Sequence, residues 1–358
     1  MESPLSRDAR GLSKALVGWF HSSKRDLPWR RNRTPWRTWV SEVMLQQTTV
    51  DTVAPRFEAF VTQFPDPHSL AAASDDAILA AWAGLGYYRR IRSLRDGARS
   101  CVEAFGGEVP RTQAALMKLP GVGPYTSGAI ASLAFGEPVA AIDGNVGRVA
   151  SRLLGIRVDP STAKGRKSIE SELIPLIPKD AAGAFNEALI ELGALVCKPS
   201  FADCGRCPIR DWCVATDGDP MHYPLKRARK ASVAVRCVRA FVPDGCHVWT
   251  TRIPDGQRLA GFQELPGRWL APGESADTAL QGVLGSLGFS EVSVGDTVAN
   301  CHHVITHHRI EVSVHRVEAR PPQVSGGSLA RIERSLLSSA SVTTETRKVA
   351  RYLLKDRR

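Results

Sequence analysis

The chain has 358 residues, which exceeds the usual size of one domain and predicts two domains, each with its own hydrophobic core. Apolar residues make up 43% and charged residues 23% of the chain, a balance that is typical of an ordinary soluble globular protein. No apolar run approaches the roughly 18 residues of a membrane span, so we expect no membrane partner. The net charge of +11 points to a polyanionic partner, with a solvated basic surface as the alternative.

The first ten residues, MESPLSRDAR, are polar and contain no apolar segment of a secretory signal. We therefore expect a cytoplasmic protein, associated with the nucleoid if the source is bacterial, and not a secreted one. A disulfide framework is disfavoured in such a compartment, so clustered cysteines favour metal ligation instead.

Apolar residues recur at helical spacing from residue 5 to about residue 215, with short glycine and proline turns between the segments. This pattern predicts an all-α domain over 1–215. The polar segment TDGDPMHYPLKRARK predicts a basic interdomain linker over 216–235. Short β-rich runs then predict an α+β domain over 236–358. The expected helices include 70–82, 184–196 and 278–287, and the expected strands are VRCVRAFV, CHVWTTR and RIEVSVHRV.

The segment RTQAALMKLPGVGPYTSGAIASLAF predicts two helices joined by a glycine-bearing hairpin. The first helix starts near Thr112 and stops at Leu119, and Pro124 suits the first turn of the second helix. Gly121 and Gly123 carry no side chains, so the amides of this turn can contact a DNA phosphate. A plain helical hairpin without a ligand is the alternative.

Two carboxylates stand out from their surroundings. Glu42 lies in WVSEVMLQQT, where apolar neighbours would raise its pKa and keep it protonated near neutrality. Asp143 follows the apolar run VAAI and precedes a helix that starts near Val146, a position that stabilises the anion. A proton donor beside an ionised carboxylate is the pair that cleavage of a glycosidic bond needs. The alternatives are an exposed helix glutamate and a simple N-cap aspartate.

Four cysteines form one cluster in the sequence. Cys197, Cys204, Cys207 and Cys213 follow the pattern C-x6-C-x2-C-x5-C within seventeen residues. Four thiolates can hold either a tetrahedral zinc ion or a 4Fe-4S cluster. Zinc sites usually pair their ligands in two short knuckles, and only one such pair occurs here, so the iron-sulfur cluster is favoured.

Together these motifs resemble the helix-hairpin-helix DNA glycosylases with an iron-sulfur cluster, and within them the MutY-type adenine glycosylases. The resemblance covers about residues 5–230. It rests on LPWR, SEVMLQQT, GLGYYRR, LPGVGPYTSGAI, DGNVGRV and the four-cysteine loop, in that order. The resemblance implies a multidomain fold. An all-α helix-hairpin-helix glycosylase domain with an iron-sulfur cluster loop at 197–213 is followed by an α+β Nudix-like domain at 236–358.

The resemblance also assigns roles to single residues. It implies that Glu42 protonates an adenine flipped out of the duplex and that Asp143 stabilises or captures the sugar cation, while Tyr125 and Asn145 support that centre. A base must leave the duplex before its glycosidic bond can be reached, and the gap must be filled. The residues that match the adenine pocket are Arg25, Leu27, Trp29, Arg30, Glu187 and Ile190. The residues that match DNA contacts are Gln47, Thr48, Tyr87, Gly121 and Gly123, among which Gln47 and Tyr87 fill the stack.

The endonuclease-III-like enzymes are the nearest alternative family, and they place a lysine in the hairpin for Schiff-base chemistry with the sugar. Tyr125 stands at that position here, and no lysine occurs between Lys118 and Lys164. We therefore expect little or no lyase activity that cleaves the strand. A non-catalytic protein that binds damaged DNA is the other alternative, which the presence of both Glu42 and Asp143 disfavours.

The second domain resembles the Nudix-like domain that reads 8-oxoguanine in MutY-type enzymes. Its segment GFQELPGRWLAPGESADTALQGVLGSLGF looks like a degenerate Nudix signature without the paired acidic residues, so pyrophosphate hydrolysis is not expected. Ile305, Thr306 and His307 match the Phe-Ser-His positions that contact the oxidised guanine, with the aromatic residue missing. The alternative for the nearby histidines is a metal cluster with Cys301, which we favour less than a polar strand face.

The predicted activity is hydrolysis of the N-glycosidic bond of adenine opposite 8-oxoguanine or guanine, a step of base excision repair that leaves an abasic site. The resemblance implies double-stranded DNA with such a mispair as the partner and a 4Fe-4S cluster as the cofactor. It also implies that the protein acts as a monomer.

Overall fold

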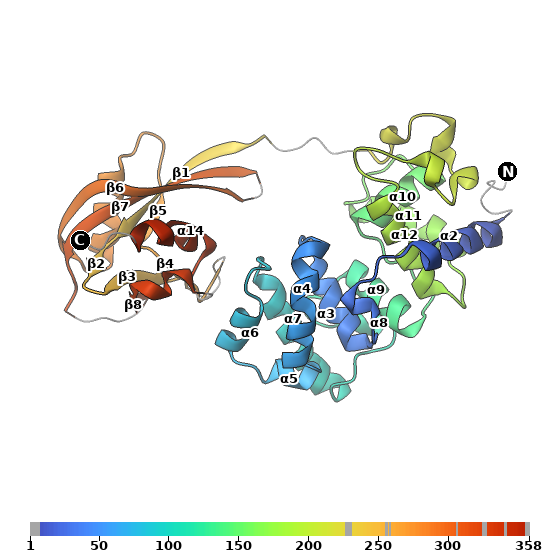
Figure 1. Cartoon of the computed structure of the whole chain (residues 1–358), viewed down its shortest axis with the longest axis horizontal. Helices are drawn as coiled ribbons and strands as arrows, with labels where there is room; N and C mark the ends of the chain where they lie inside the picture. Colours follow the sequence, from blue (N-terminus) through green and yellow to red (C-terminus); the bar gives the residue numbers. More distant parts are fainter. Residues whose placement is uncertain are drawn as a thin grey trace. The chain divides into compact units, whose positions relative to one another are not determined.

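The computed structural model describes residues 8–225, 231–254, 257, 259–305, 307–323, 328–339 and 342–354, apart from the side chains of His303 and Ile305. The chain divides into two compact units, Met1–Ala228 and Arg229–Arg358 (Figure 1). Within the described ranges, every helix is too short or too polar to span a membrane.

The first unit consists of α-helices joined by turns and short 3-10 helices, which confirms the prediction of an all-α domain (Figure 1). The continuous helix predicted over 70–82 is wrong, because the chain forms α5 (Pro67–Ala71) and α6 (Asp75–Ala81) there. The hydroxyl group of Ser74 accepts a hydrogen bond from the amide of Ala77 and so starts a new helix. The other α-helices are α2 (Ala9–Ser23), α3 (Pro35–Leu45), α4 (Val50–Gln63), α7 (Arg89–Phe105), α8 (Gln113–Leu116), α9 (Pro124–Phe135), α10 (Gly144–Leu154), α11 (Ala163–Leu173) and α12 (Ala182–Leu195). The 3-10 helices are η1 (Pro28–Arg30), η2 (Ile174–Leu176), η3 (Cys204–Arg206), η4 (Arg210–Trp212), η5 (Val214–Asp217) and η6 (Pro220–His222).

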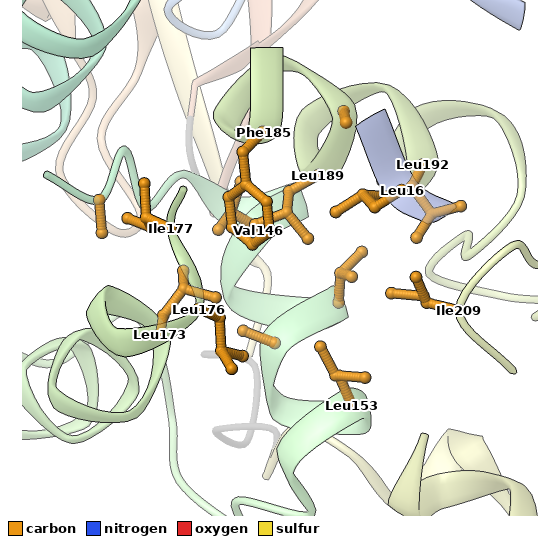
Figure 2. Packing of buried hydrophobic residues seen from close by; sticks show 14 of the residues in the cluster. Leu16, Val146, Leu153, Leu173, Leu176, Ile177, Phe185, Leu189, Leu192 and Ile209 are labelled. Carbon is orange, nitrogen blue, oxygen red and sulfur yellow. The ribbon is translucent and has the colours of Figure 1, made fainter. Parts of the chain in front are cut away.

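Side chains from α2, α10, α11 and α12 build one hydrophobic core of the first unit (Figure 2). Leu16 of α2, Val146 of α10 and Leu189 of α12 expose no surface to solvent. Full burial of each such side chain contributes about 1.5 to 3 kcal/mol to folding. This packing holds the first turn of α10 beside α12, so residues of both helices can line one pocket.

The predicted glycine hairpin joins α8 to α9, and Pro124 is the first residue of α9. The first helix is shorter than predicted and ends at Leu116, with a turn over the following residues. Gly121 has a φ of 76°, and a Cβ atom there would lie 2.6 Å from the Cβ of Ser93, so backbone conformation and packing both require glycine. A Cβ atom at Gly123 would meet nothing within 4 Å, so this side of the turn is open to a ligand.

The boundary between the two units falls inside the predicted linker 216–235, but much of that segment is folded. Helix η6 belongs to the first unit, where the buried guanidinium group of Arg152 donates a hydrogen bond of 2.9 Å to the carbonyl of Pro220. At the other end, β1 already begins at Val233. A polar segment rich in turn residues suits 3-10 turns as well as a linker, so composition alone overestimated its length.

The second unit is an α+β fold, as predicted, and contains two four-stranded sheets. In one sheet the strand order is β5-β1-β7-β6, with β1 parallel to β7 and the other pairs antiparallel. In the other sheet β3 pairs with β2, β4 and β8. The strands are β1 (Val233–Phe241), β2 (Pro243–Asp244), β3 (His247–Arg252), β4 (Gln263–Glu264), β5 (Gly267–Trp269), β6 (Ser290–Ile305), β7 (His308–Arg320) and β8 (Leu329–Glu333).

Two helices flank the sheets of this unit and close two separate hydrophobic cores. Helix α13 (Ala276–Ser286) matches the predicted helix and buries Leu280 and Leu284. Helix α14 (Thr344–Leu353), which the sequence did not predict, buries Val349 and Leu353 against the other core. The 3-10 helix η7 (Arg334–Ser338) precedes it.

Candidate active site

One pocket of about 590 Å³ in the first unit collects residues from segments far apart in the sequence. They come from η1 and the turn before it, from α3 and the turn after it, from the starts of α9 and α10, and from one face of α12. Pockets of this size hold small organic ligands. The predicted site residues that line it are Arg25, Leu27, Trp29, Arg30, Glu42, Gln47, Thr48, Tyr125, Asp143, Asn145, Glu187 and Ile190. Of the residues predicted for catalysis, the adenine pocket or DNA contacts, Tyr87, Gly121 and Gly123 lie outside its lining.

Glu42 lies on α3 with only 5% of its surface exposed, and its Oε2 atom accepts a hydrogen bond of 2.5 Å from the hydroxyl group of Tyr125. Burial raises the pKa of Glu42 to about 7 despite the opposing hydrogen bond from Tyr125, and the charge of Asp143 adds to the rise. The prediction of a buried glutamate with a raised pKa is confirmed, and the exposed-glutamate alternative is wrong. Burial also raises the pKa of Tyr125 well above its usual value, so the phenol keeps its proton and acts as the donor.

Asp143 is the N-cap of α10. Its Oδ1 atom accepts a hydrogen bond of 2.7 Å from the amide of Val146, and its Oδ2 atom accepts one of 3.1 Å from the side chain of Asn145. Burial raises the pKa of Asp143 above its usual value, while the amides of Val146 and Asn145 oppose the rise. The expectation of simple stabilisation of the anion by the helix N-terminus is therefore corrected: desolvation outweighs it.

Paired charges form one wall of the pocket. The guanidinium group of Arg25 donates two hydrogen bonds, of 2.8 and 2.9 Å, to the two carboxylate oxygens of Glu191. Arg30 bridges the two glutamates of α12, donating to Glu187 at 3.0 Å and to Glu191 at 3.1 Å. Arg33 completes the network with a bond of 2.8 Å to Glu187. Multiple donors hold both carboxylates in fixed orientations.

Sequence reasoning did not single out Glu191 and Arg33, although both line the pocket. Glu191 is completely buried. Burial alone would raise the pKa of Glu191, but hydrogen bonds from Arg25 and Arg30 lower it to about 2. Its position four residues after Glu187 places it on the same helix face, a signal that could have identified it. No comparable signal marked Arg33.

Gln47 and Tyr87 lie on two neighbouring loops, the first between α3 and α4 and the second between α6 and α7. Gln47 is exposed, and Tyr87 exposes 54% of its surface. Both have left-handed backbone conformations, with φ values of 57° and 47°. Thr48 joins the two loops, because its hydroxyl group donates a hydrogen bond of 3.2 Å to the carbonyl of Leu85.

The four clustered cysteines line one small pocket of about 20 Å³ beside α10, together with Arg152. Nη1 of Arg152 donates a hydrogen bond of 3.1 Å to Sγ of Cys197. Among the described residues, no group of three or more histidine, cysteine or acidic side chains is arranged to hold a single metal ion. Four thiolates in one place could hold an iron-sulfur cluster or a zinc ion, because both take sulfur ligands.

Arg148 connects this loop with the aspartate turn. Its guanidinium group donates a hydrogen bond of 2.9 Å to Oδ1 of Asn145 and another of 2.9 Å to the carbonyl of Cys197. A third bond, of 2.8 Å, goes to the carbonyl of Gly193 on α12. The first residues of α10, the end of α12 and the start of the cysteine loop are thus fixed relative to one another.

In the second unit, the predicted residue Thr306 lies outside the described residues. His307 lies at the turn between β6 and β7, and its ring contacts that of His308 with centroids 4.1 Å apart. The His308 ring in turn lies 5.6 Å from that of Trp269, which exposes 46% of its surface. No metal site with Cys301 is found in the described part of this unit.

The helical hairpin and the carboxylate pocket define a protein of the helix-hairpin-helix base excision repair class, and residues 40–175 match the HhH-GPD superfamily base excision DNA repair proteins. The chain is 34% identical to the adenine DNA glycosylase of Mycolicibacterium smegmatis over 270 residues, which cover 75% of this chain and 89% of that protein. The chain therefore belongs to the adenine DNA glycosylase family, and the resemblance read from its motifs is confirmed.

Other known proteins are similar to part of this chain. The human adenine DNA glycosylase is 44% identical over 210 residues, which cover 56% of this chain and 38% of that protein. The chain thus spans well under half the length of this curated relative. The solved structure of a thermostable thymine-DNA glycosylase superimposes with a TM-score of 0.54 at 26% identity, over 59% of this chain and 97% of that protein.

Proposed function

We propose that the protein is an adenine DNA glycosylase that hydrolyses the N-glycosidic bond of adenine opposite 8-oxoguanine or guanine in duplex DNA. The observation that carries this proposal is the carboxylate pair of the pocket: Glu42 is buried with a pKa of about 7, and Asp143 lines the same space. A proton donor and a second carboxylate with different environments are what glycosidic cleavage requires. Family membership supports the choice of adenine as the base that leaves.

In the proposed reaction, Glu42 is the general acid. Its protonated form donates a proton to a ring nitrogen of the adenine, so the base leaves as a neutral molecule when the bond to C1′ breaks. The hydroxyl group of Tyr125 fixes the orientation of the Glu42 carboxyl group through the bond of 2.5 Å. A positioned acid of this kind contributes about a hundredfold to ten-thousandfold in rate.

Asp143 stabilises the positive charge that develops at C1′ or captures it in a covalent bond. Two hydrogen bonds, from Val146 and from Asn145, hold its carboxylate in place. A water molecule then adds to C1′, and its proton returns to the Glu42 carboxylate. The products are free adenine and an abasic site. The pair therefore works in the pH range where Asp143 has lost its proton and Glu42 retains one.

The charged wall gives the pocket its selectivity for a polar flat base. Arg25, Arg30 and the two glutamates of α12 hold one another, so they present fixed donors and acceptors to the base edge. Leu27 and Trp29 are buried beside them and supply apolar contact area. Fixed polar groups in a largely apolar pocket are the usual basis of ligand specificity.

The protein is proposed to release the base without cutting the strand. Among the described residues that line the pocket there is no lysine, and Tyr125 occupies the hairpin position nearest to Glu42. Schiff-base chemistry with the sugar needs an amine, which a tyrosine cannot supply.

A 4Fe-4S cluster is the proposed cofactor, held by Cys197, Cys204, Cys207 and Cys213. The common pocket of the four thiols and the soft donor set support it. The cluster would supply a rigid link between the ends of the cysteine loop. Arg152 would donate a hydrogen bond to one of its ligands, and the exposed Arg206 would offer charge to a DNA phosphate.

The second unit is proposed to be a Nudix-like module that reads the base opposite adenine, and the protein is proposed to act on double-stranded DNA as a monomer. His307, at the turn between β6 and β7, and Thr306, which lies outside the described residues, are the proposed contacts. In a test, His307→Ala should lower the preference for adenine opposite 8-oxoguanine over adenine opposite guanine by about tenfold. His247→Ala, in the same unit on β3, is the control, and equal preference ratios in the two variants would contradict this role.

The test of the main proposal is single-turnover base release from four duplexes, containing adenine opposite 8-oxoguanine, adenine opposite guanine, adenine opposite thymine, and an oxidised pyrimidine. Strand breaks that require alkali, and that form fastest with adenine opposite 8-oxoguanine, are the expected result. Cleavage of the oxidised pyrimidine duplex without alkali would instead indicate an endonuclease-III-like lyase and overturn the proposal.

A further inference from the structure

Arg90 lies where the loops of Gln47 and Tyr87 meet. It is the second residue of α7 and exposes only 8% of its surface. Its guanidinium carbon lies 5.4 Å from the ring centroid of Trp82 and 5.5 Å from that of Tyr87. Neither the motifs nor the pocket geometry had singled out this residue.

The two ends of the Arg90 guanidinium group bind different loops. Nη1 donates to the carbonyls of Val43 at 3.0 Å and Met44 at 2.8 Å, and also to the carbonyl of Gln46. The first two of these belong to the last turn of α3, whose carbonyls lack partners within the helix. Arg90 therefore caps the helix that carries Glu42 and holds the residue directly before Gln47.

Nη2 binds the other loop. It donates to the carbonyls of Leu85 at 3.0 Å and Gly86 at 3.2 Å, and to the hydroxyl group of Thr48 at 2.8 Å. Gly86 directly precedes Tyr87, so the guanidinium group holds the backbone immediately before each of the two exposed side chains. One planar group with a fixed fork of donors sets the distance between the loops.

The hydrogen bonds of Arg90 compensate for two unfavourable features, which are backbone strain in the loops and burial of a charged side chain. Left-handed backbone at a residue other than glycine is strained and persists only where the surroundings enforce it, which applies to Gln47 and Tyr87. A buried guanidinium group is usually paired with a carboxylate, whereas the described hydrogen-bond partners of Arg90 are carbonyl groups and the hydroxyl group of Thr48. Burial lowers the pKa of Arg90 to about 10, and the charge of Tyr87 opposes this shift. The loop carbonyls satisfy the hydrogen-bond donors of the buried Arg90 side chain, and the Arg90 side chain in turn holds the two loops in their conformations.

We propose that Arg90 is a positioning residue that holds Gln47 and Tyr87 together as the wedge that fills the DNA stack when the adenine is extruded. This inference rests on the proposed function. Arg90 does not touch the substrate; it acts through the two loop residues, and so it affects extrusion of the base and not its protonation.

The test is a double-mutant cycle measured by single-turnover release of adenine from the duplex with 8-oxoguanine. Arg90→Lys keeps the charge but loses the fork of donors, and should lower the rate about tenfold in the otherwise unchanged protein. In the background Gln47→Ala with Tyr87→Ala, which removes the wedge, the same change should lower the rate less than about twofold. Arg99→Lys, on the exposed side of the same helix, is the matched control and should have no effect.

Two further measurements separate positioning from a general structural role. Thermal unfolding shows whether Arg90→Lys is folded, and Thr48→Val, which removes one acceptor of the guanidinium group, gives a smaller perturbation with the same expected coupling. The descending alkaline part of the rate profile, set by Glu42, should stay in place in both variants. A profile that shifts would place the defect in the helix of Glu42 and contradict the proposal.

The experiment distinguishes failure of the positioning role of Arg90 from failure of the proposed function. If the unchanged protein releases no adenine, the proposed function fails, and the inference about Arg90 fails with it. If the unchanged protein is active but Arg90→Lys lowers the rate equally with and without the wedge side chains, the function stands and the positioning role is overturned.

Discussion

The hydroxyl group of Tyr125 donates a hydrogen bond of 2.5 Å to Oε2 of Glu42, across 83 positions of sequence. The bond joins the hairpin helix α9 to α3 inside the pocket. Because it stabilises the ionised form of Glu42, it lowers the pKa of this carboxyl group, and burial outweighs it to give a pKa of about 7. The balance of these two effects sets the pH range in which Glu42 can donate a proton.

Replacement of Glu42 by glutamine should abolish base release, with a rate loss of about a hundredfold or more, because the amide cannot donate the required proton. Binding of the duplex should stay within about threefold, since the side chain keeps its shape. Single-turnover release and a duplex binding titration check this. Glu172→Gln, at an exposed position of α11, is the control. Near-normal release by the Glu42 variant would refute its role as the acid.

Asp143→Asn separates catalysis from helix capping. Asparagine caps a helix about as well as aspartate but loses the hydrogen bond from Asn145, so the free energy of unfolding should fall by only about 1 kcal/mol. The rate of base release should nevertheless fall about a hundredfold or more, because the neutral side chain cannot stabilise the sugar cation. Urea unfolding measures the free energy of unfolding, and single-turnover kinetics on the same sample measure the rate of base release. A variant that loses stability but retains its rate would leave Asp143 as a simple N-cap.

The rate of base release should fall as the pH rises through about 7, because the protonated form of Glu42 is the active one. Tyr125→Phe removes a hydrogen bond that lowers the pKa of Glu42, so the descending part of the profile should move to higher pH. Rate profiles between about pH 5 and 9 test the shift. Tyr352→Phe, at a partly exposed position of the second unit, should leave the profile unchanged. A shift to lower pH in the Tyr125 variant would contradict this account of the pocket.

Glu191→Gln should destabilise the first unit by about 3 kcal/mol at pH 7, because it leaves Arg25 and Arg30 without their shared carboxylate. The folded-state pKa of Glu191 is about 2, below the ordinary 4.5, so its contribution is present above pH 4.5 and is lost as the pH falls toward 2. Urea unfolding at several pH values tests this. The difference in the free energy of unfolding between the variant and the unchanged protein should become smaller in acid. A difference that does not depend on pH would exclude a charge effect.

Cys204→Ser should lower the iron and sulfide content of the protein and its visible absorption. The reason is that a serine oxygen is a poor replacement for one of four thiolate ligands. The unchanged protein should carry about four iron atoms per chain. Cys246→Ser, at an exposed position of the second unit, is the control and should retain full iron content. One zinc atom per chain in place of iron would exclude the proposed cluster.

The sequence predicted the features that depend on local spacing. The helical periodicity, the Gly121 turn, the N-cap position of Asp143 and the apolar neighbours of Glu42 all act over a few residues, so they can be read directly along the chain. Strand β6 was missed, because residues 290–305 contain polar and glycine positions that interrupt the alternation, and its pairing with β7 supplies the missing stability.

Only the tertiary structure decided which side chains meet. Glu191 and Arg33 gain their importance from partners over 150 positions away, and Arg90 gains its importance from two loops that packing brings together. The final pKa of Glu42 also depends on burial and on one distant phenol. Desolvation and long-range hydrogen bonds arise only when separate segments pack against each other. The sequence therefore determined the elements and the candidate acids, and the packing of α3, α9, α10 and α12 determined their chemistry.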